Sequence, residues 1–287
     1  MNTHIKILAI TLLAALPLSN SQAGWMQSEG DFAVSSGLGY KDNANYFDMA
    51  GKSMKNTCGS GFNVPLFAEY GYSYYNTLYA TSSLDSFSCG VTKMQGINDI
   101  EVGTRGHMDY FIDHNWELAA IFPQHISPTG AANLPKQFGI KAGIHSSLRL
   151  EPYQTFLTES EIQKNNVAYG GGIKYWTGDV PGELWGYVGY SRILKDSDWA
   201  KDIGGWSFNA RLDAKNSLGK THPTAGFAGV GTDQHDAFRL VQGQIGFTRT
   251  LSVSESMNFS IDRGLWGKNI GFGSGFFATY SKVFRKN

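Results

Sequence analysis

Apolar and polar residues alternate along most of this chain, in segments of about ten residues. In one such segment Trp206, Phe208 and Leu212 share one parity, while Asn209 and Arg211 occupy the other. A period of two indicates a β-strand with two different faces, because successive side chains in a strand point to opposite sides. After the first residues, no useful stretch shows the period of an α-helix. The pattern therefore predicts an all-β chain.

The alternating segments are long enough to cross a membrane. A tilted transmembrane strand needs roughly 9–11 residues. About twelve segments of this length follow one another, and single-chain bacterial barrels have an even number of strands. The predicted strands cover residues 31–40, 64–72, 78–84, 97–108, 116–123, 138–146, 167–176, 184–194, 206–214, 239–250, 257–266 and 272–284. Residues 184–194 carry apolar side chains at both parities, so their facing stays open. We predict a transmembrane up-and-down antiparallel β-barrel of about twelve strands.

Residues 1–23 differ from the rest of the chain. Lys6 precedes an uncharged apolar run over residues 7–18, and small residues surround a cleavage site after Ala23. This layout is typical of a secretory signal peptide, and the run is too short to span a bilayer as a helix. We expect the mature chain to begin at Gly24, to form one barrel domain to residue 287, and to reach the bacterial cell outer membrane.

Connector lengths predict the orientation, because periplasmic turns are short and outer loops are longer in bacterial barrels. With a periplasmic N-terminus, the outer loops are expected at residues 41–62, 86–96, 124–137, 177–183, 217–238 and 267–271. The connectors at the other end are then residues 73–76, 109–115, 147–166, 195–205 and 251–255. Three of these five are short, so we expect both termini in the periplasm.

Composition agrees with a barrel and excludes some partners. The chain has 35 glycines and 14% aromatic residues, which barrels use at strand bends and in the girdles at the membrane interfaces. Lys and Arg together number 24, as do Asp and Glu, so there is no excess charge for a nucleic acid. No nucleic-acid partner is expected.

The two cysteines, Cys58 and Cys89, flank one predicted hairpin. An even number of cysteines in an exported chain favours a disulfide, and here the bond would join two neighbouring outer loops. The alternative is a pair of free thiols.

If the apolar parity faces lipid, the polar parity lines the lumen. The candidate lumen-lining residues are Glu69, Asp99, Glu101, Arg105, His107, Glu117, Lys141, Lys174, Arg211, Asp213, Gln242, Gln244 and Asp262. Both signs of charge are present, so cross-lumen pairs can satisfy them and rigidify the interior. The alternative reading is a selective passage, in which these charges decide which solute crosses.

Catalytic and metal-binding signals are weak in this sequence. His145-Ser146-Ser147 resembles part of an acyl-transfer site, but no orienting third group or Gly-x-Ser-x-Gly motif accompanies it. Gly170-Gly171-Gly172 lies inside a predicted strand with no helix after it, which favours strand curvature over phosphate binding. The histidines lack metal-ligand spacing. We expect no enzymatic activity, metal or cofactor.

Several short motifs resemble a family of outer-membrane proteins. Residues 96–105, with the sequence Gly-Ile-Asn-Asp-Ile-Glu-Val-Gly-Thr-Arg, are similar to the G-x-G-D strand of the putative transporter family labelled meta-pathway of phenol degradation, which includes XagA-like proteins. Ala68-Glu69-Tyr70-Gly71 resembles that family's E-Y-G element, and residues 175–189 and 238–284 are also similar. Asn98 stands where the family commonly has Gly, and Phe284 is followed by three further residues.

The resemblance implies passive passage of a small organic solute, including a partly apolar one, through the outer membrane. The expected partners are this solute, outer-membrane lipid and lipopolysaccharide, and the barrel-assembly machinery. The alternative is a plugged barrel with a structural or surface-binding role, or one associated with polysaccharide export. Aromatic loop residues such as Tyr46 and Phe87 would suit surface binding, although girdles also contain aromatics.

Overall fold

The computed structural model describes most of the predicted barrel domain. It covers residues 27–48, 50–55, 58–89, 92–97, 100–107, 114–122, 138–149, 165–177, 182–193, 205–218, 238–252, 254–268 and 270–286. The predicted signal peptide, residues 1–23, and the candidate Asp99 lie outside these residues. In the described part of the chain, no helix has the length and hydropathy needed to cross a membrane.

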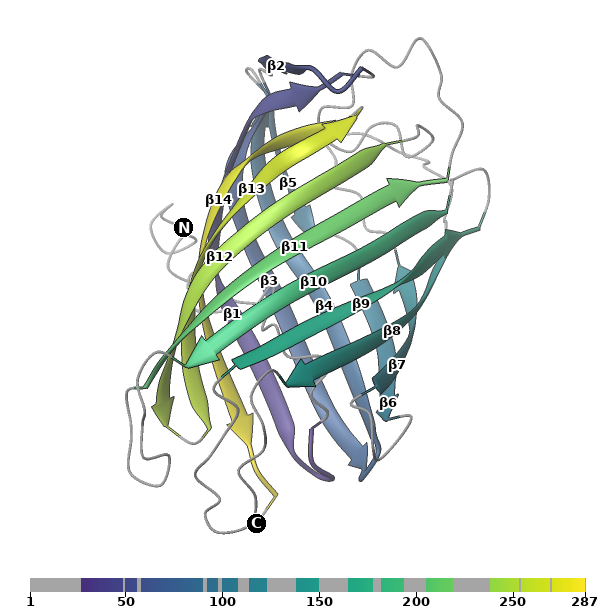
Figure 1. Ribbon diagram of the computed structural model, residues 1–287, viewed down its shortest axis with the longest axis vertical. Coiled ribbons are helices and arrows are strands. Elements are labelled where there is room, and N and C mark those ends of the chain that lie inside the picture. Colours follow the sequence, from purple (N-terminus) through teal and green to yellow (C-terminus); the bar gives the residue numbers. More distant parts are fainter. Residues whose placement is uncertain are drawn as a thin grey trace, which may run out of the picture.

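All strands belong to one antiparallel sheet, which curls into the barrel of Figure 1. The strands are β1 (Phe32–Phe47), β2 (Ser53–Lys55), β3 (Cys58–Ser73), β4 (Asn76–Cys89), β5 (Thr92–Ile97), β6 (Ile100–His107), β7 (His114–Phe122), β8 (Gly139–Arg149), β9 (Asn165–Trp176), β10 (Glu183–Ile193), β11 (Trp206–Ser217), β12 (Arg239–Ser252), β13 (Glu255–Lys268) and β14 (Ile270–Phe284). Because β2 and β3 both pair with β1, and β5 and β6 both pair with β4, the closed wall counts twelve strands, as predicted.

The first and last long strands close the barrel. β1 pairs with β14 from Phe32 opposite Phe284 to Phe47 opposite Ile270. A bilayer does not tolerate a free sheet edge, and this ladder leaves none between the two strands. The start of β1 and the end of β14 therefore lie at the same end of the barrel, and the short strand β2 lies at the other end (Figure 1). We call these the terminal end and the β2 end.

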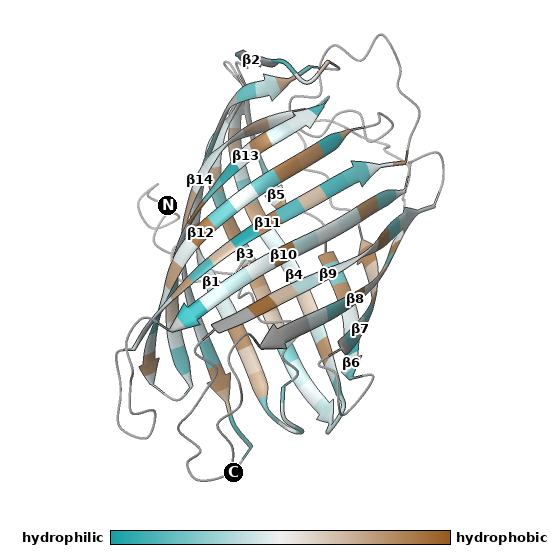
Figure 2. Ribbon diagram, in the orientation of Figure 1, coloured by the Kyte–Doolittle hydropathy of each residue, from teal (hydrophilic) through white to brown (hydrophobic). Residues whose placement is uncertain are grey.

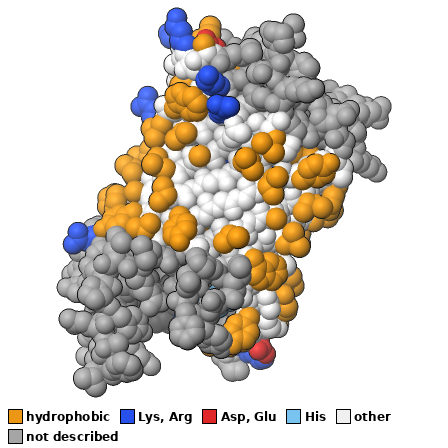
Figure 3. Space-filling view, turned by 45° about the vertical axis from the view of Figure 1, so that its right-hand side comes forward, with side chains coloured by type: hydrophobic (Ala, Val, Ile, Leu, Met, Phe, Trp, Pro, Cys, Tyr) orange, Lys and Arg blue, Asp and Glu red, His pale blue; other side chains and the backbone are white. Residues whose placement is uncertain are grey.

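Alternation along each strand gives the wall two different faces. On β12, Ile245 and Phe247 are 53% and 45% exposed, whereas Gln244, which directly precedes Ile245, is 7% exposed. Hydrophobic and hydrophilic residues alternate along several other strands as well (Figure 2). Hydrophobic side chains therefore spread over the outer surface of the barrel (Figure 3). A soluble protein would bury them, but a barrel in a bilayer turns them to the lipid.

Two of the predicted outer loops are mostly strand. Residues 41–62 contain the end of β1, β2 and the start of β3, and residues 86–96 contain the β4–β5 hairpin. Polar residues such as Asp42 and Ser53 interrupt the apolar alternation there, which is why the sequence favoured loops. The backbone ladder continues regardless, because strands that extend beyond a lipid-facing band no longer need an apolar face. Each end of the barrel has both short and long connectors between the strands, so the orientation stays a prediction.

The ladder places the two cysteines opposite each other. Cys58 of β3 is the direct partner of Cys89 of β4. The two side chains lie outside the described part of the structure, so the disulfide remains a prediction.

Candidate functional site: the inner face of the barrel

The inner face is built from alternate residues of neighbouring strands. Inward positions on β6, β7 and β8 include Glu101, Arg105, Glu117, Lys141 and His145. These strands are hydrogen-bonded neighbours, so residues at similar heights come within reach of one another. Five of the predicted lining residues, with Tyr79 of β4 and His145, form one polar network on this part of the wall; the five are Glu69, Glu101, Arg105, Glu117 and Lys141.

Glu117 lies at the centre of this network, and its side chain has no exposed surface. Its carboxylate accepts a hydrogen bond of 2.8 Å from Nζ of Lys141 and lies against the Tyr79 hydroxyl and Nε2 of His145. Lys141 also donates to Glu101 at 2.8 Å. A buried carboxylate is costly unless it is paired and hydrogen-bonded, so these donors allow Glu117 to be charged inside the wall.

Arg105 connects the network to β3. Its Nη1 lies 2.6 Å from Oε1 of Glu69, and its guanidinium stacks 4.4 Å from the centre of the Tyr79 ring. The second carboxylate oxygen of Glu69 accepts a hydrogen bond of 2.9 Å from the side chain of Gln27. The backbone N–H of Gln27 donates to Oγ1 of the fully buried Thr77. The segment before β1 therefore lies against the inner face of β3 and β4, near the terminal end.

Strands β1, β11 and β13 carry two further pairs of charged residues. Asp262 of β13 lies 3.8 Å from Nζ of Lys41 and accepts a hydrogen bond from the Gln242 side chain. On β11, Arg211 and Asp213 are two residues apart on the same face and form an ion pair of 2.7 Å. The charges of both groups are paired within the wall, which lowers the cost of burying them.

Each of the remaining predicted lining residues has its own neighbour on the wall. Nδ1 of His107 lies 3.0 Å from Oδ1 of Asn115. The buried Gln244 donates to Oγ of Ser260 at 3.2 Å. Lys174 is partly buried on β9, opposite Glu183 in the ladder. These residues belong to the polar parity but are not hydrogen-bonded to the Glu117 network in the described residues.

β10 adds two aromatic rings that the sequence did not assign to either face. Leu184 and Val188 are exposed on the outside, so Trp185 and Tyr187 turn inward. The two ring planes are parallel within 3° and their centroids are 6.5 Å apart. Nδ1 of His145 lies 3.0 Å from the Tyr187 hydroxyl, which joins β10 to the Glu117 network.

Glycines on β8 and β9 make room for these rings. A Cβ built on Gly172 would lie 2.8 Å from Cζ2 of Trp185, and one built on Gly170 would lie 2.7 Å from Cε1 of Tyr187. A Cβ on Gly143 of β8 would lie even closer to the Trp185 ring. The rings therefore lie flat on a stretch of wall without side chains. This explains Gly170 and Gly172 by close packing of the rings, rather than by curvature alone.

Cations flank the two rings, and two buried polar atoms beside them lack partners. Nζ of Lys141 lies 5.2 Å from the Trp185 ring centre, and Cζ of Arg211 lies 4.0 Å from the Tyr187 ring centre. Nε1 of Trp185 and Oε1 of Glu183 have no hydrogen-bond partner among the described residues. Glu183, Trp185 and Tyr187 are alternate residues of one strand, so this stretch of β10 carries two rings on the inner face with a buried donor and a buried acceptor beside them.

His145 and Ser146 do not form a base and nucleophile pair. Successive residues of a strand point to opposite faces, so His145 and Ser146 lie on different sides of the wall. Both ring nitrogens of His145 already contact Glu117 and Tyr187. This is not the nucleophile and base arrangement that acyl transfer requires.

Sequence reasoning missed several members of this site, namely Tyr79, Trp185, Tyr187 and Gln27. Residues 184–194 carry apolar side chains at both parities, so alternation gives no facing for Trp185 and Tyr187. The available signal was the glycine run of β9: side-chain-free positions on one strand leave space for large rings on the next. Gln27 precedes the first strand, so periodicity gave no information about it.

The fold is similar to that of solved outer-membrane proteins, whereas no family model and no curated protein matches the sequence. The COG4313 outer membrane channel from Pseudomonas putida F1 superposes with a TM-score of 0.62 at 12% identity, over 93% of this chain and 100% of that chain. NanC porin has a TM-score of 0.49 at 8% identity, over 88% and 98%. LpxR from Salmonella typhimurium has a TM-score of 0.48 at 10% identity, over 88% and 100%. The first likeness shows the fold of an outer-membrane β-barrel.

Proposed function

We propose that this chain is an outer-membrane channel for passive transport of a small organic solute with a partly apolar ring. The observation that carries this proposal is the inner face of β10, where Trp185 and Tyr187 lie parallel beside the unpartnered Glu183 Oε1 and Trp185 Nε1. Small-molecule sites combine apolar surface with a few convergent polar groups, and this face has both.

The paired charges suit passage rather than tight binding. Glu117 and Lys141 already satisfy each other, as do Arg211 and Asp213. A solute therefore does not need to replace water around unpaired charges, and its weak contacts with the rings let it leave again. The concentration gradient drives the flux, and no cofactor takes part. The resemblance to the XagA-like transporters points to the same class of solute.

Planar-bilayer conductance of the purified protein tests the proposal. We expect discrete openings, and we expect a ring-bearing solute to block the ionic current more weakly in Trp185→Ala than in the wild type. Phe208→Ala on β11 is the control, because its ring packs edge to face against Phe247 on the outer face. Openings that respond equally in both variants would contradict a role for the β10 rings, and a silent wild-type protein would contradict the channel.

A plugged barrel with a structural, surface-binding or polysaccharide-export role is the second candidate, and one observation favours it. Gln27 bonds to Glu69 and Thr77 on the inner face, so the described residues just before β1 occupy part of the lumen. If this segment closes the channel, the wild type is silent and a variant lacking residues 24–28 conducts. Equal conductance of the two proteins would show that the segment does not block the passage.

A further inference from the structure

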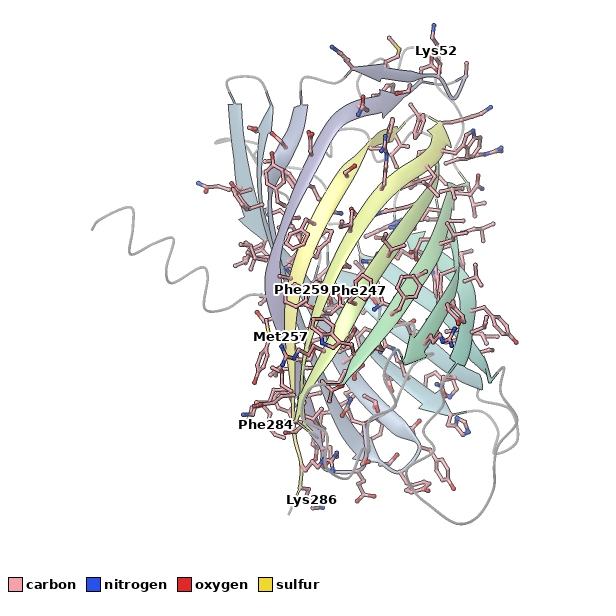
Figure 4. All side chains as sticks on the ribbon, turned by 60° about the vertical axis from the view of Figure 1, so that its left-hand side comes forward. Lys52, Phe247, Met257, Phe259, Phe284 and Lys286 are labelled. Carbon is pink, nitrogen blue, oxygen red and sulfur yellow. The ribbon has the colours of Figure 1, made fainter. Side chains whose placement is uncertain are left out.

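Four basic side chains lie at the β2 end of the barrel. Lys52, Lys55 and Arg239 are exposed, and Lys268 is partly exposed. We call this group the basic rim. Lys52 lies at the opposite end of the barrel from Lys286, which follows the last strand (Figure 4). Lys and Arg side chains border the hydrophobic outer surface at this end (Figure 3).

Three neighbouring parts of the wall bring these residues together. Arg239 of β12 is the direct ladder partner of Lys268 of β13. The turn between β1 and β2 packs on the end of β13, because a Cβ built on Gly51 would lie 3.8 Å from Cε of Lys268 and 3.6 Å from Nε1 of Trp266. Lys52 follows Gly51 directly. The rim therefore joins the β1–β2 hairpin to the β12–β13 pair.

The basic rim has no internal charge partner in the described residues. None of the four forms an ion pair there. Asp48 is close in sequence, but its Oδ1 accepts hydrogen bonds from the backbone N–H groups of Ala50 and Lys52, at 2.9 and 2.8 Å. Like charges directly opposite on two strands, such as Arg239 and Lys268, destabilise a sheet unless an anion lies between them.

The terminal end differs in this respect. Lys282 there forms an ion pair of 2.8 Å with Glu255 across β13 and β14. Arg249 stacks 5.6 Å from the centre of the Trp206 ring. Arg192 lies on β10, two strands away from Arg249. Lys282 and Arg249 therefore have partners, and Arg192 is separated from Arg249 by β11, whereas Arg239 and Lys268 of the basic rim face each other directly.

Exposed apolar side chains lie beside the basic rim. Leu265 and Trp266 of β13 are exposed on the outer surface, as is Met54 of β2. Trp side chains favour the boundary between acyl chains and headgroups, so this height of the wall is where headgroups begin. A ligand that carries phosphates above acyl chains fits such a surface, because guanidinium groups bind phosphate through paired hydrogen bonds.

We propose that the basic rim binds the phosphate groups of a phosphorylated glycolipid in the outer leaflet of the membrane. This inference depends on the proposed outer-membrane location and on the orientation that places the β2 end outside. Phosphate oxygens lie between Arg239 and Lys268 and relieve their repulsion. Lys52 contributes from the neighbouring hairpin, and the acyl chains lie along Leu265 and Trp266.

Retention of defined lipids by the purified protein in detergent tests this site. The probes are bis-phosphorylated lipid A, the same lipid without phosphates, and phosphatidylglycerol. We expect the wild type to retain bis-phosphorylated lipid A through gel filtration and the double variant R239Q/K268Q to bind it roughly tenfold more weakly, because two charge-assisted contacts are lost. The matched control is R192Q/R249Q, which removes two arginines from the terminal end.

Three results would overturn the proposal. They are equal retention of the dephosphorylated lipid, an equal loss in the control variant, and equal retention of phosphatidylglycerol, which would make the site a general anion surface. Folding of each variant is checked by heat-modifiable migration on SDS gels. Conductance in a neutral bilayer without glycolipid is measured separately, so a failure of the channel does not count against the lipid site, nor the reverse.

Discussion

Nζ of Lys141 lies 2.8 Å from Oε1 of Glu117, a carboxylate whose side chain has no exposed surface. The two residues lie on neighbouring strands, and Lys141 approaches Glu117 diagonally, since its direct ladder partner is Ala119. Tyr79 and His145 approach the same carboxylate from β4 and β8. One buried charge thus ties three strands together on the inner face.

Lys141→Met should therefore destabilise the barrel. The change removes the cation shared by Glu117 and Glu101, and breaking a buried pair from one side costs about 3–5 kcal/mol. Asp213→Asn is the control, because Asp213 is 30% exposed and its pair with Arg211 should contribute less than about 1 kcal/mol. Urea unfolding in lipid vesicles measures both. Equal losses in the two variants would mean that the network adds no special stability.

The two faces of β12 should respond differently to charge. Ile245→Arg places a cation at an exposed apolar site near the middle of the strand, which costs about 2–4 kcal/mol in the bilayer. Gln244→Arg turns the same charge toward the lumen, where Asp262 lies on the neighbouring strand. Folded yield in vesicles distinguishes them. If both variants fold equally well, the lipid-facing assignment of the outer parity is wrong.

The sequence predicted the barrel because its main constraint is local. Ile245 is apolar and exposed because it faces outward, and Gln244 is polar and buried because it faces the lumen. The alternation of apolar and polar residues in the sequence shows this directly. The strand ends were less predictable. β1 continues past Asp42 to Phe47, beyond the apolar alternation, because its backbone still pairs with β14 and β2. Backbone pairing leaves no signal in hydropathy.

The aromatic part of the inner face was not predictable from parity. Trp185 and Tyr187 are as apolar as the residues beside them on β10, so alternation gave no facing. What turns them inward is the absence of side chains on Gly143, Gly170 and Gly172, which belong to two other strands. That relation appears only once the register between strands is known. Contacts such as Gln27 with Glu69 likewise join residues far apart in the sequence.

Gly172→Ala tests how closely the rings pack on the wall. Its Cβ would lie 2.7 Å from Cα of Gly143 and 2.8 Å from Cζ2 of Trp185, so the ring or the backbone must move. We expect a loss of about 1–3 kcal/mol, typical of overpacking. Gly186→Ala is the matched control, because the nearest atom to its Cβ would be 3.4 Å away. Equal unfolding curves for the two variants would show that the wall accommodates a methyl group at either site.

An inserted epitope tests the orientation. The β1–β2 turn, with Ala50 beside the positive-φ Gly51, lies at the β2 end, and Ser254 lies in the β12–β13 turn at the terminal end. If the β2 end is outside, antibody should label intact cells carrying an epitope at Ala50 but not those carrying one at Ser254. Permeabilised cells provide the control for expression. Labelling only at Ser254 would invert the barrel and remove the basis for a glycolipid at the basic rim.

The facing cysteines provide the final prediction. Cys58 and Cys89 are direct partners in the β3–β4 ladder, and opposed residues in an antiparallel pair have Cα atoms about 4.5–5.5 Å apart, within the range of a disulfide. In an oxidising compartment we expect the bond to form and to close a loop of about 30 residues, which stabilises by roughly 2–4 kcal/mol. The gain should be smaller here, because the ladder already holds both ends of the loop.

Mass spectrometry of the digested, non-reduced protein should find the two cysteine peptides linked, and Cys58→Ser should abolish that species without preventing folding. Two freely alkylated thiols in protein purified from the cell envelope would refute the bond, while the register that places the cysteines opposite each other would stand.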